Sequence, residues 1–193
     1  MVGNLTTDEK SRIYAAIADA ESRTHVHVAV SIVPVSDRYL LYPVAWGAVI
    51  ALLAVGVIAI GWPHFSLRQA FVVEALVFVV LSIVLEWRPL RLMFVPRAIR
   101  RHRAEALARR EFAARILASS ERKGGVLFFV SLGERYAEIL ADRETHARIG
   151  TATWERVLRD YVTAAKSRPI GDAITAAIAA CAAVLQTPAE RQT

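Results

Sequence analysis

Residues 39–87 are almost free of charge, and this stretch constrains the fold more than any other part of the sequence. Residues 39–67 contain no Asp, Glu, Lys or Arg, and the run from Gln69 to Leu85 contains only Glu74. A helix needs about 20 residues to cross a bilayer core that is about 30 Å thick. The stretch therefore predicts a transmembrane helical hairpin, with spans over residues 41–62 and 70–87 and a turn between them.

Two features of the predicted spans bear on packing and function. Gly47, Ala51 and Ala54 are small residues at helical spacing, which would let the two helices approach each other closely. Glu74 is the acidic residue within the second span, and intramembrane carboxylates are candidates for a functional role. Its position close to the turn also fits an ion pair with Arg68 at the level of the headgroups, and the sequence leaves both interpretations open.

A cluster of arginines follows the second span in a chain of net charge +6. The residues expected to contact the membrane surface are Arg88, Arg91, Arg97, Arg100, Arg101 and Arg103. Such a cluster is attracted to anionic lipid headgroups by about 1 kcal/mol per residue. The positive-inside rule then predicts two spans in the inner (plasma) membrane, with both termini in the cytoplasm. No nucleic-acid partner is expected, because the cluster lacks interleaved aromatic residues.

The remaining segments, 1–38 and 88–193, are predicted to form one discontinuous cytoplasmic domain. They comprise roughly 145 residues, enough for a hydrophobic core. A capping-box pattern, Thr6 followed by Glu9, predicts the start of a helix. The predicted elements are a helix over 5–22, a strand over 25–33, a helix over 96–119, strands over 126–132 and 135–140, and helices from Trp154 and from Pro169.

The order of these elements predicts the topology. The first two strands are joined by a long crossover that contains a helix, so they should be parallel. The second and third strands form an antiparallel hairpin, on which Glu134 and Glu138 are expected to face solvent. We expect an α/β fold in which a small mixed sheet is sandwiched by helices, with the transmembrane hairpin inserted in the first crossover. The single cysteine, Cys181, is expected to be a buried thiol.

Two stretches resemble the TPM domain family. They are GGVLFFVSLGERYAEILAD, from Gly124 to Asp142, and the opening helix LTTDEKSRIYAAIADAESRT. The family is named for a thylakoid lumen protein, a photosystem II repair protein and a modulator of nicotinic-type receptors. The bacterial members that this chain most resembles are small membrane proteins, in which a similar strand pair is followed by a Trp-containing helix, here at Trp154. The resemblance covers nearly all of the predicted cytoplasmic part and implies an α/β/α sandwich.

The resemblance also implies expectations about sites. Some relatives bind divalent cations, calcium among them, through acidic residues at loop ends beside the sheet, and weak acid phosphatase activity is associated with some. The matching acidic position is Asp142, and Asp172 at a helix start is a second candidate metal ligand. On its own, Asp142 also fits a turn residue and Asp172 a helix N-cap. Relatives often have an acidic residue on the first strand where this chain has His27.

The leading hypothesis is a non-catalytic interaction or accessory module of a membrane-associated complex, whose partner is a membrane protein or a second copy of the chain. It rests on the lack of a recognisable catalytic constellation, since Ser131 lies in an apolar strand and not on a nucleophile elbow. The alternative is a weak divalent-metal-dependent phosphatase that uses Asp142 and Asp172. A third hypothesis is an oligomeric channel with Glu74 in its pore.

Overall fold

The computed structural model describes residues 5–24, 26–37, 39, 41–61, 64, 66–85, 95–118 and 124–186. The chain divides into two compact units. Unit 1 consists of Met1–Ser36 and His102–Thr193, and unit 2 consists of Asp37–Arg101.

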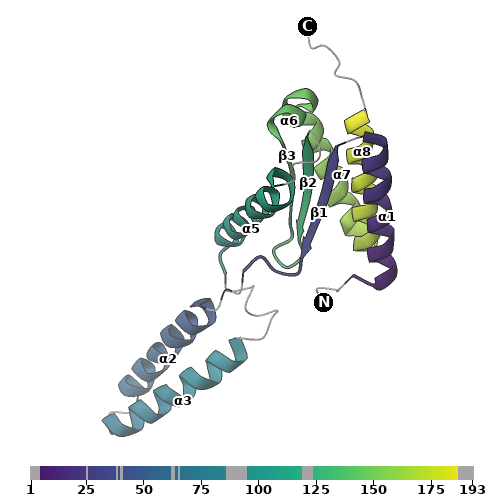
Figure 1. The fold of residues 1–193 in the computed structure, drawn as a ribbon. Helices are drawn as coiled ribbons and strands as arrows, with labels where there is room; N and C mark the ends of the chain where they lie inside the picture. The colour runs from purple at the N-terminus through teal and green to yellow at the C-terminus, as the bar shows by residue number, and fades with distance from the viewer. Residues whose placement is uncertain are drawn as a thin grey trace. The chain divides into compact units, whose positions relative to one another are not determined.

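Unit 1 is built around a three-stranded sheet in the order β1-β2-β3 (Figure 1). Strand β1 (His27–Val33) pairs in parallel with β2 (Gly125–Ser131), so that Val28 lies opposite Val126. Strand β3 (Tyr136–Ala141) returns antiparallel to β2. The small mixed α/β sheet predicted from the element order is therefore confirmed. Because β2 lies between the other two strands, all seven of its residues are buried, which explains its continuous apolar sequence.

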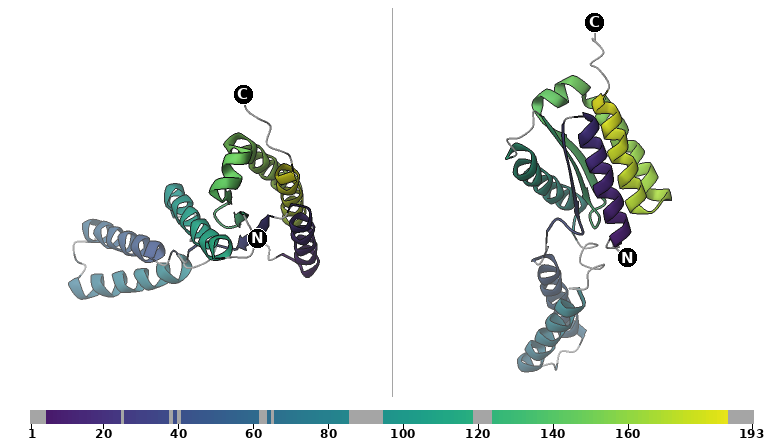
Figure 2. Two further views of the ribbon diagram at one scale, coloured as in Figure 1. Left: turned by 45° about the horizontal axis from the view of Figure 1, so that its top comes forward. Right: turned by 45° about the vertical axis from the view of Figure 1, so that its right-hand side comes forward.

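Helices cover both faces of this sheet. On one face lie α1 (Thr7–Thr24), α7 (Thr151–Ser167) and α8 (Ile170–Gln186), as Figure 2 shows from two further directions. Their apolar side chains pack with Val28, Val126 and Phe128 into the larger hydrophobic core. Alternate residues of the same strands point to the other face, where Leu127 and Phe129 pack against α5 (Arg97–Phe112) and the π-helical turn η1 (Ala113–Leu117).

The predicted start of the first helix is confirmed by its hydrogen bonds. The Thr6 N–H donates to Glu9 Oε2 at 2.8 Å, and the Glu9 N–H donates to Thr6 Oγ1 at 3.2 Å. These two reciprocal bonds form a capping box and satisfy amide groups that the helix itself cannot pair. Helix α1 continues to Thr24, two residues beyond the predicted end.

Helix α6 (Arg143–Ile149) is absent from the sequence prediction. Its seven residues form about two turns, too few for a clear apolar periodicity. It ends at Gly150, which has φ +83° and ψ 152°, a conformation that is essentially restricted to glycine. Gly150 thereby separates α6 from α7.

Unit 2 contains two apolar helices, α2 (Leu41–Gly61) and α3 (Leu67–Leu85), which pack against each other. The predicted small-residue stripe faces this contact, since Ala51 is buried and a Cβ atom on Gly47 would lie 3.5 Å from Ser82 Oγ. Helix α3 begins three residues before the predicted position. Ser66 and Gln69 form a second capping box there, with the Ser66 N–H donating to Gln69 Oε1 at 3.0 Å.

Candidate functional site

The apolar helices of unit 2 expose most of their large side chains. Windows of 18 residues in α2 and 19 in α3 have mean hydropathies of 2.2 and 2.1, and only 17% and 0% of them are buried. Leu52 is 65% exposed, Ile60 87% and Phe71 71%. A soluble protein would bury such helices in its core. Both helices are long and apolar enough to cross a membrane.

Glu74 lies half-buried on α3, in its second turn. Its carboxylate forms no ion pair with Arg68 in the described part of the chain, so the suggested pairing at headgroup level is not present. Glu74 therefore remains a candidate intramembrane polar residue, and its role stays a prediction.

The predicted basic cluster is described in part. Arg88 and Arg91 lie outside the described residues, whereas the other four arginines lie on α5. Of these four, Arg97, Arg101 and Arg103 are exposed and Arg100 is half-buried. One turn further along, Arg109 pairs with Glu105 at 2.5 Å. The first half of α5 thus presents a positive surface, as contact with anionic headgroups requires.

Asp142 joins the start of β2 to the start of α6. Its Oδ1 atom accepts hydrogen bonds from the N–H groups of Glu144 and Thr145, at 3.0 and 3.1 Å, which makes it the N-cap of α6. Its Oδ2 atom accepts from the Gly125 N–H at 2.7 Å. Burial alone would raise the pKa of Asp142, but the bonds from the Thr145 side chain and from the three backbone amides outweigh it and lower the pKa.

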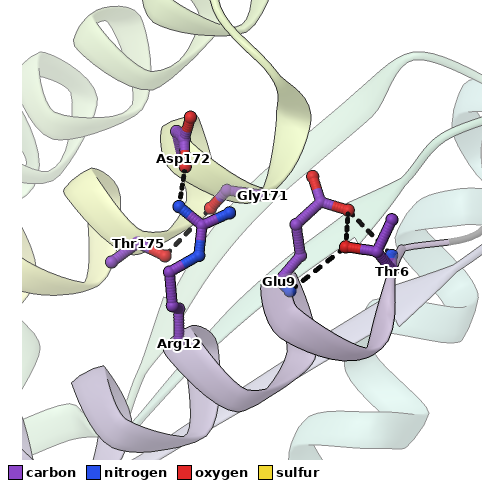
Figure 3. Close-up of polar contacts among 6 residues, drawn as sticks. All are labelled: Thr6, Glu9, Arg12, Gly171, Asp172 and Thr175. Atoms are coloured by element: carbon purple, nitrogen blue, oxygen red, sulfur yellow. Dashed lines mark hydrogen bonds and ion pairs between the residues drawn. The ribbon is translucent and has the colours of Figure 1, made fainter.

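Asp172 lies in the first turn of α8, beside the first turns of α1 (Figure 3). Its Oδ1 atom is 2.5 Å from Nη1 of Arg12. The neighbouring Glu9 carboxylate has a lowered pKa, chiefly because of the backbone and side-chain hydrogen bonds from Thr6, with further contributions from the Gly171 N–H and from Arg12. Both carboxylates therefore tie the start of α1 to the start of α8.

The structure does not bring Asp142 and Asp172 together. Asp142 accepts a hydrogen bond from Gly125, the first residue of β2, which lies opposite His27, the first residue of β1. Helix α1 ends at Thr24, close to this end of the sheet. Asp172 contacts Arg12, which belongs to α1. At 1.5 Å per residue, Arg12 lies about 18 Å before Thr24 along this helix. In Figure 1, α6 accordingly lies at the opposite end of unit 1 from the start of α8.

No group of three or more His, Cys, Asp or Glu side chains within the described ranges is placed to hold a metal ion. Calcium takes six to eight oxygen ligands, and Asp142 already uses both of its oxygens as acceptors for amide groups. Metal binding at Asp142 or Asp172 stays a prediction. His27 is hydrogen-bonded within the fold, with its Nδ1 atom 2.6 Å from Oε1 of Glu21.

A polar cluster that sequence reasoning missed lies where β1 and β2 end. Glu134, expected to face solvent, accepts from the Ser36 N–H at 2.8 Å and from the hydroxyl of Ser131. The Ser36 hydroxyl donates to Ser131 Oγ at 3.0 Å, and Ser131 is 1% exposed. Two loop residues and Ser131, the last residue of β2, thereby close one end of the sheet. No spacing in the sequence could predict it, because Ser36 and Glu134 are 98 residues apart.

Comparison with known proteins gives evidence for the fold only. No protein-family model and no curated protein matches the chain. The NMR structure of the BA42 protein from the psychrophilic bacterium Bizionia argentinensis is similar, with a TM-score of 0.56 and 13% sequence identity. The similarity covers 98% of this chain and 88% of that one. At this identity the likeness shows a common fold and nothing about activity.

Proposed function

We propose that the protein is a membrane-anchored member of the TPM domain family, in which helices α2 and α3 cross the inner membrane and unit 1 serves as a cytoplasmic interaction module. The exposed apolar surface of unit 2 carries this proposal. Leu and Ile side chains that are 65–87% exposed would be unfavourable in water, at about 25 cal/mol per Å² of apolar area. In lipid the same side chains are in a matching solvent.

Two further observations support the assignment. The stretch that resembles the TPM domain family coincides with β2, the following turn and β3, which form one hairpin in unit 1. Arg97, Arg101 and Arg103 are exposed on α5, which follows the second span in sequence. Positive charge at this point favours retention of the flanking segments in the cytoplasm. No observation in the described residues favours a metal-dependent phosphatase in the same way.

The membrane arrangement can be tested with single cysteines, because Cys181 is 1% exposed and gives little background labelling. His64 lies between α2 and α3, and Arg148 lies in the last turn of α6. In intact cells, a membrane-impermeant maleimide should label His64→Cys and leave Arg148→Cys unlabelled. Both variants should react after lysis, which controls for intrinsic reactivity. Labelling of Arg148→Cys in intact cells would overturn the proposed orientation.

The proposed role predicts a stoichiometric partner. Affinity purification of the full chain in a mild detergent should recover a membrane protein or a second copy of the chain, in a fixed ratio over several detergents. An unrelated two-span protein purified in parallel shows which proteins are retained non-specifically. A chain that is monomeric and alone under all of these conditions would contradict the interaction role and leave the membrane anchoring intact.

A further inference from the structure

Glu74 lies near the middle of α3, deeper in the helix than the sequence predicts. Helix α3 runs from Leu67 to Leu85, so its middle residue is Leu76 and Glu74 is two residues away. At 1.5 Å per residue this separation is about 3 Å along the helix axis. Helix α3 is about as long as a bilayer core is thick. If α3 crosses the membrane, this carboxyl group is therefore close to the bilayer midplane.

The carboxyl group of Glu74 has no partner in its own hairpin. The side chain is half-buried, and it forms no hydrogen bond or ion pair with any residue that the structure describes. Helix α2, which packs against α3, contains only Gly, Ala, Val, Leu and Ile from Gly47 to Gly61. A carboxyl group in hydrocarbon is costly, and such groups are found paired with other polar groups. Glu74 therefore calls for a partner from outside the hairpin.

Within the two spans, no second polar side chain lies at the depth of Glu74. It is the only polar residue of α3 between Gln69 and Ser82. Ser82 is about 12 Å further along the helix axis. Its hydroxyl is also enclosed by the contact with α2, because Ser82 Oγ is buried and a Cβ atom on Gly47 would lie 3.5 Å from it. In a second copy of the hairpin, the polar group at the right depth is again Glu74.

Twofold symmetry brings these two carboxyl groups together. Copies that are inserted in the same orientation can be related by an axis along the membrane normal, and a residue close to that axis then meets its own counterpart. Two carboxyl groups at hydrogen-bond distance share at least one proton, because like charges so close together cannot both ionise. Each group thereby gains the polar partner that its own hairpin does not provide.

We infer that the protein forms a homodimer in the membrane, in which Glu74 of one copy is hydrogen-bonded to Glu74 of the other through a shared proton. This inference rests on the proposed membrane insertion. It deepens the proposed interaction role, because it names the partner as a second copy and the contact as a carboxyl pair. It also differs from a channel, because a carboxyl group that is paired at the twofold axis does not line a water-filled pore.

The test measures association of the full chain in lipid vesicles. His64→Cys, in the turn between the spans, is labelled with a donor or an acceptor dye, and energy transfer between copies is followed as the protein-to-lipid ratio falls. Glu74→Leu has a side chain of similar size that cannot hydrogen-bond, and it should raise the dissociation constant about threefold to thirtyfold. Glu74→Gln can pair with itself through its amide group, so its dissociation constant should stay within about threefold of the wild-type value.

Two controls separate the dimer from the membrane insertion on which it rests. Glu155→Leu makes the same replacement on the exposed surface of α7, outside the spans, and should leave association unchanged. Insertion is checked by labelling of His64→Cys with an impermeant maleimide in intact cells, with and without each change at Glu74. If this site is not labelled in the otherwise wild-type chain, both the membrane arrangement and the dimer are overturned.

The remaining outcomes bear on the dimer alone. Correct labelling without energy transfer, or association of Glu74→Leu as tight as that of the wild type, would overturn the dimer and leave the membrane arrangement intact. The mass of the complex in an uncharged detergent should correspond to two copies, and a larger ring would contradict the carboxyl pair. A complex with a different protein that is lost in Glu74→Leu, without energy transfer between copies, would assign the contact to that protein and overturn the homodimer.

Discussion

Removal of the Asp142 side chain tests the structural role of this residue against the predicted role as a metal ligand. In Asp142→Ala, helix α6 loses its N-cap and the Gly125 N–H loses its acceptor. Loss of an N-cap costs about 0.5–2 kcal/mol. An unpaired amide at a buried position such as Gly125 costs about 1–3 kcal/mol. The two losses share one carboxylate, so we expect a destabilisation of about 2–4 kcal/mol.

Asp142→Asn should have a smaller effect of about 1–2 kcal/mol. Asparagine is as good an N-cap as aspartate. Its single amide oxygen can serve either the amides of Glu144 and Thr145 or the Gly125 N–H, but not both. The predicted order of stability is therefore wild type, then Asp142→Asn, then Asp142→Ala.

Unfolding of unit 1 can be followed by pulsed alkylation of Cys181 at increasing urea concentration. This thiol is 1% exposed, and burial raises its pKa to about 12, so it reacts only when the unit opens. Asp172→Asn is the matched control. It breaks an ion pair whose side chains are 55% and 40% exposed, and such pairs contribute about 0–1 kcal/mol.

The pH dependence gives a second signature of the same role. The folded pKa of Asp142 is lowered, so its carboxylate stabilises the fold above the unfolded pKa of about 3.9, and this stabilisation is lost as the pH falls through the folded pKa. Asp142→Asn should remove this part of the acid sensitivity. The reasoning is refuted if Asp142→Ala costs less than about 0.5 kcal/mol. Wild-type stability that falls with chelator, in a way that Asp142→Ala abolishes, would identify a metal ligand instead.

Three further predictions concern packing, titration and backbone conformation. Gly125→Ala would place a Cβ atom 2.3 Å from Ile116 Cγ2, so it should destabilise unit 1 by about 1–3 kcal/mol. Because Ile116→Ala removes the clashing atom, the double variant should lose less stability in urea titrations than the sum of the two single variants. Burial raises the pKa of Tyr161 to about 12. Its protonated hydroxyl therefore contributes fully to stability below pH 10, and this contribution is lost as the pH rises towards 12. Tyr161→Phe should reduce the loss of stability at alkaline pH, which circular dichroism can follow. Gly150→Ala forces a side chain onto φ +83° and should lower the urea midpoint by an amount equivalent to about 1–3 kcal/mol.

Most of the fold follows from local patterns in the sequence. The alternation of residues 26–32 predicts a strand with Val26, Val28, Val30 and Ile32 on one face, and in the structure this face packs into the larger core. The continuous apolar run at 126–131 predicts a strand buried on both faces, as observed. The pair Thr6 and Glu9 predicts the start of α1 because a capping box is formed within three residues. The long helical crossover between the first two strands predicts that they are parallel, as observed. Each of these features depends on neighbours along the chain or on connection length.

Two of the features that could not be predicted depend on residues distant in sequence, and the third is a helix of only seven residues. Glu134 follows a glycine in a turn, and its pattern indicates solvent exposure, yet it binds Ser36 across 98 residues. Arg12 and Asp172 are 160 residues apart and belong to helices whose relative placement no periodicity specifies. Helix α6 is too short for its periodicity to be visible, and it depends on the side chain of Asp142 as its cap. Carboxylates at the ends of elements are the residues that sequence reasoning places least well.

The partners of the half-buried carboxylates bear on whether unit 1 can bind a metal ion. In the described part of unit 1, every half-buried carboxylate accepts a hydrogen bond from another group of the chain or forms an ion pair with one. These carboxylates include Glu9, Glu21, Glu111, Glu134, Asp142 and Asp172. A cation would have to displace those donors and bear the cost of leaving them unpaired. Binding of a metal ion at these carboxylates therefore requires rearrangement of contacts that hold the fold together, although acidic residues first suggest a metal site.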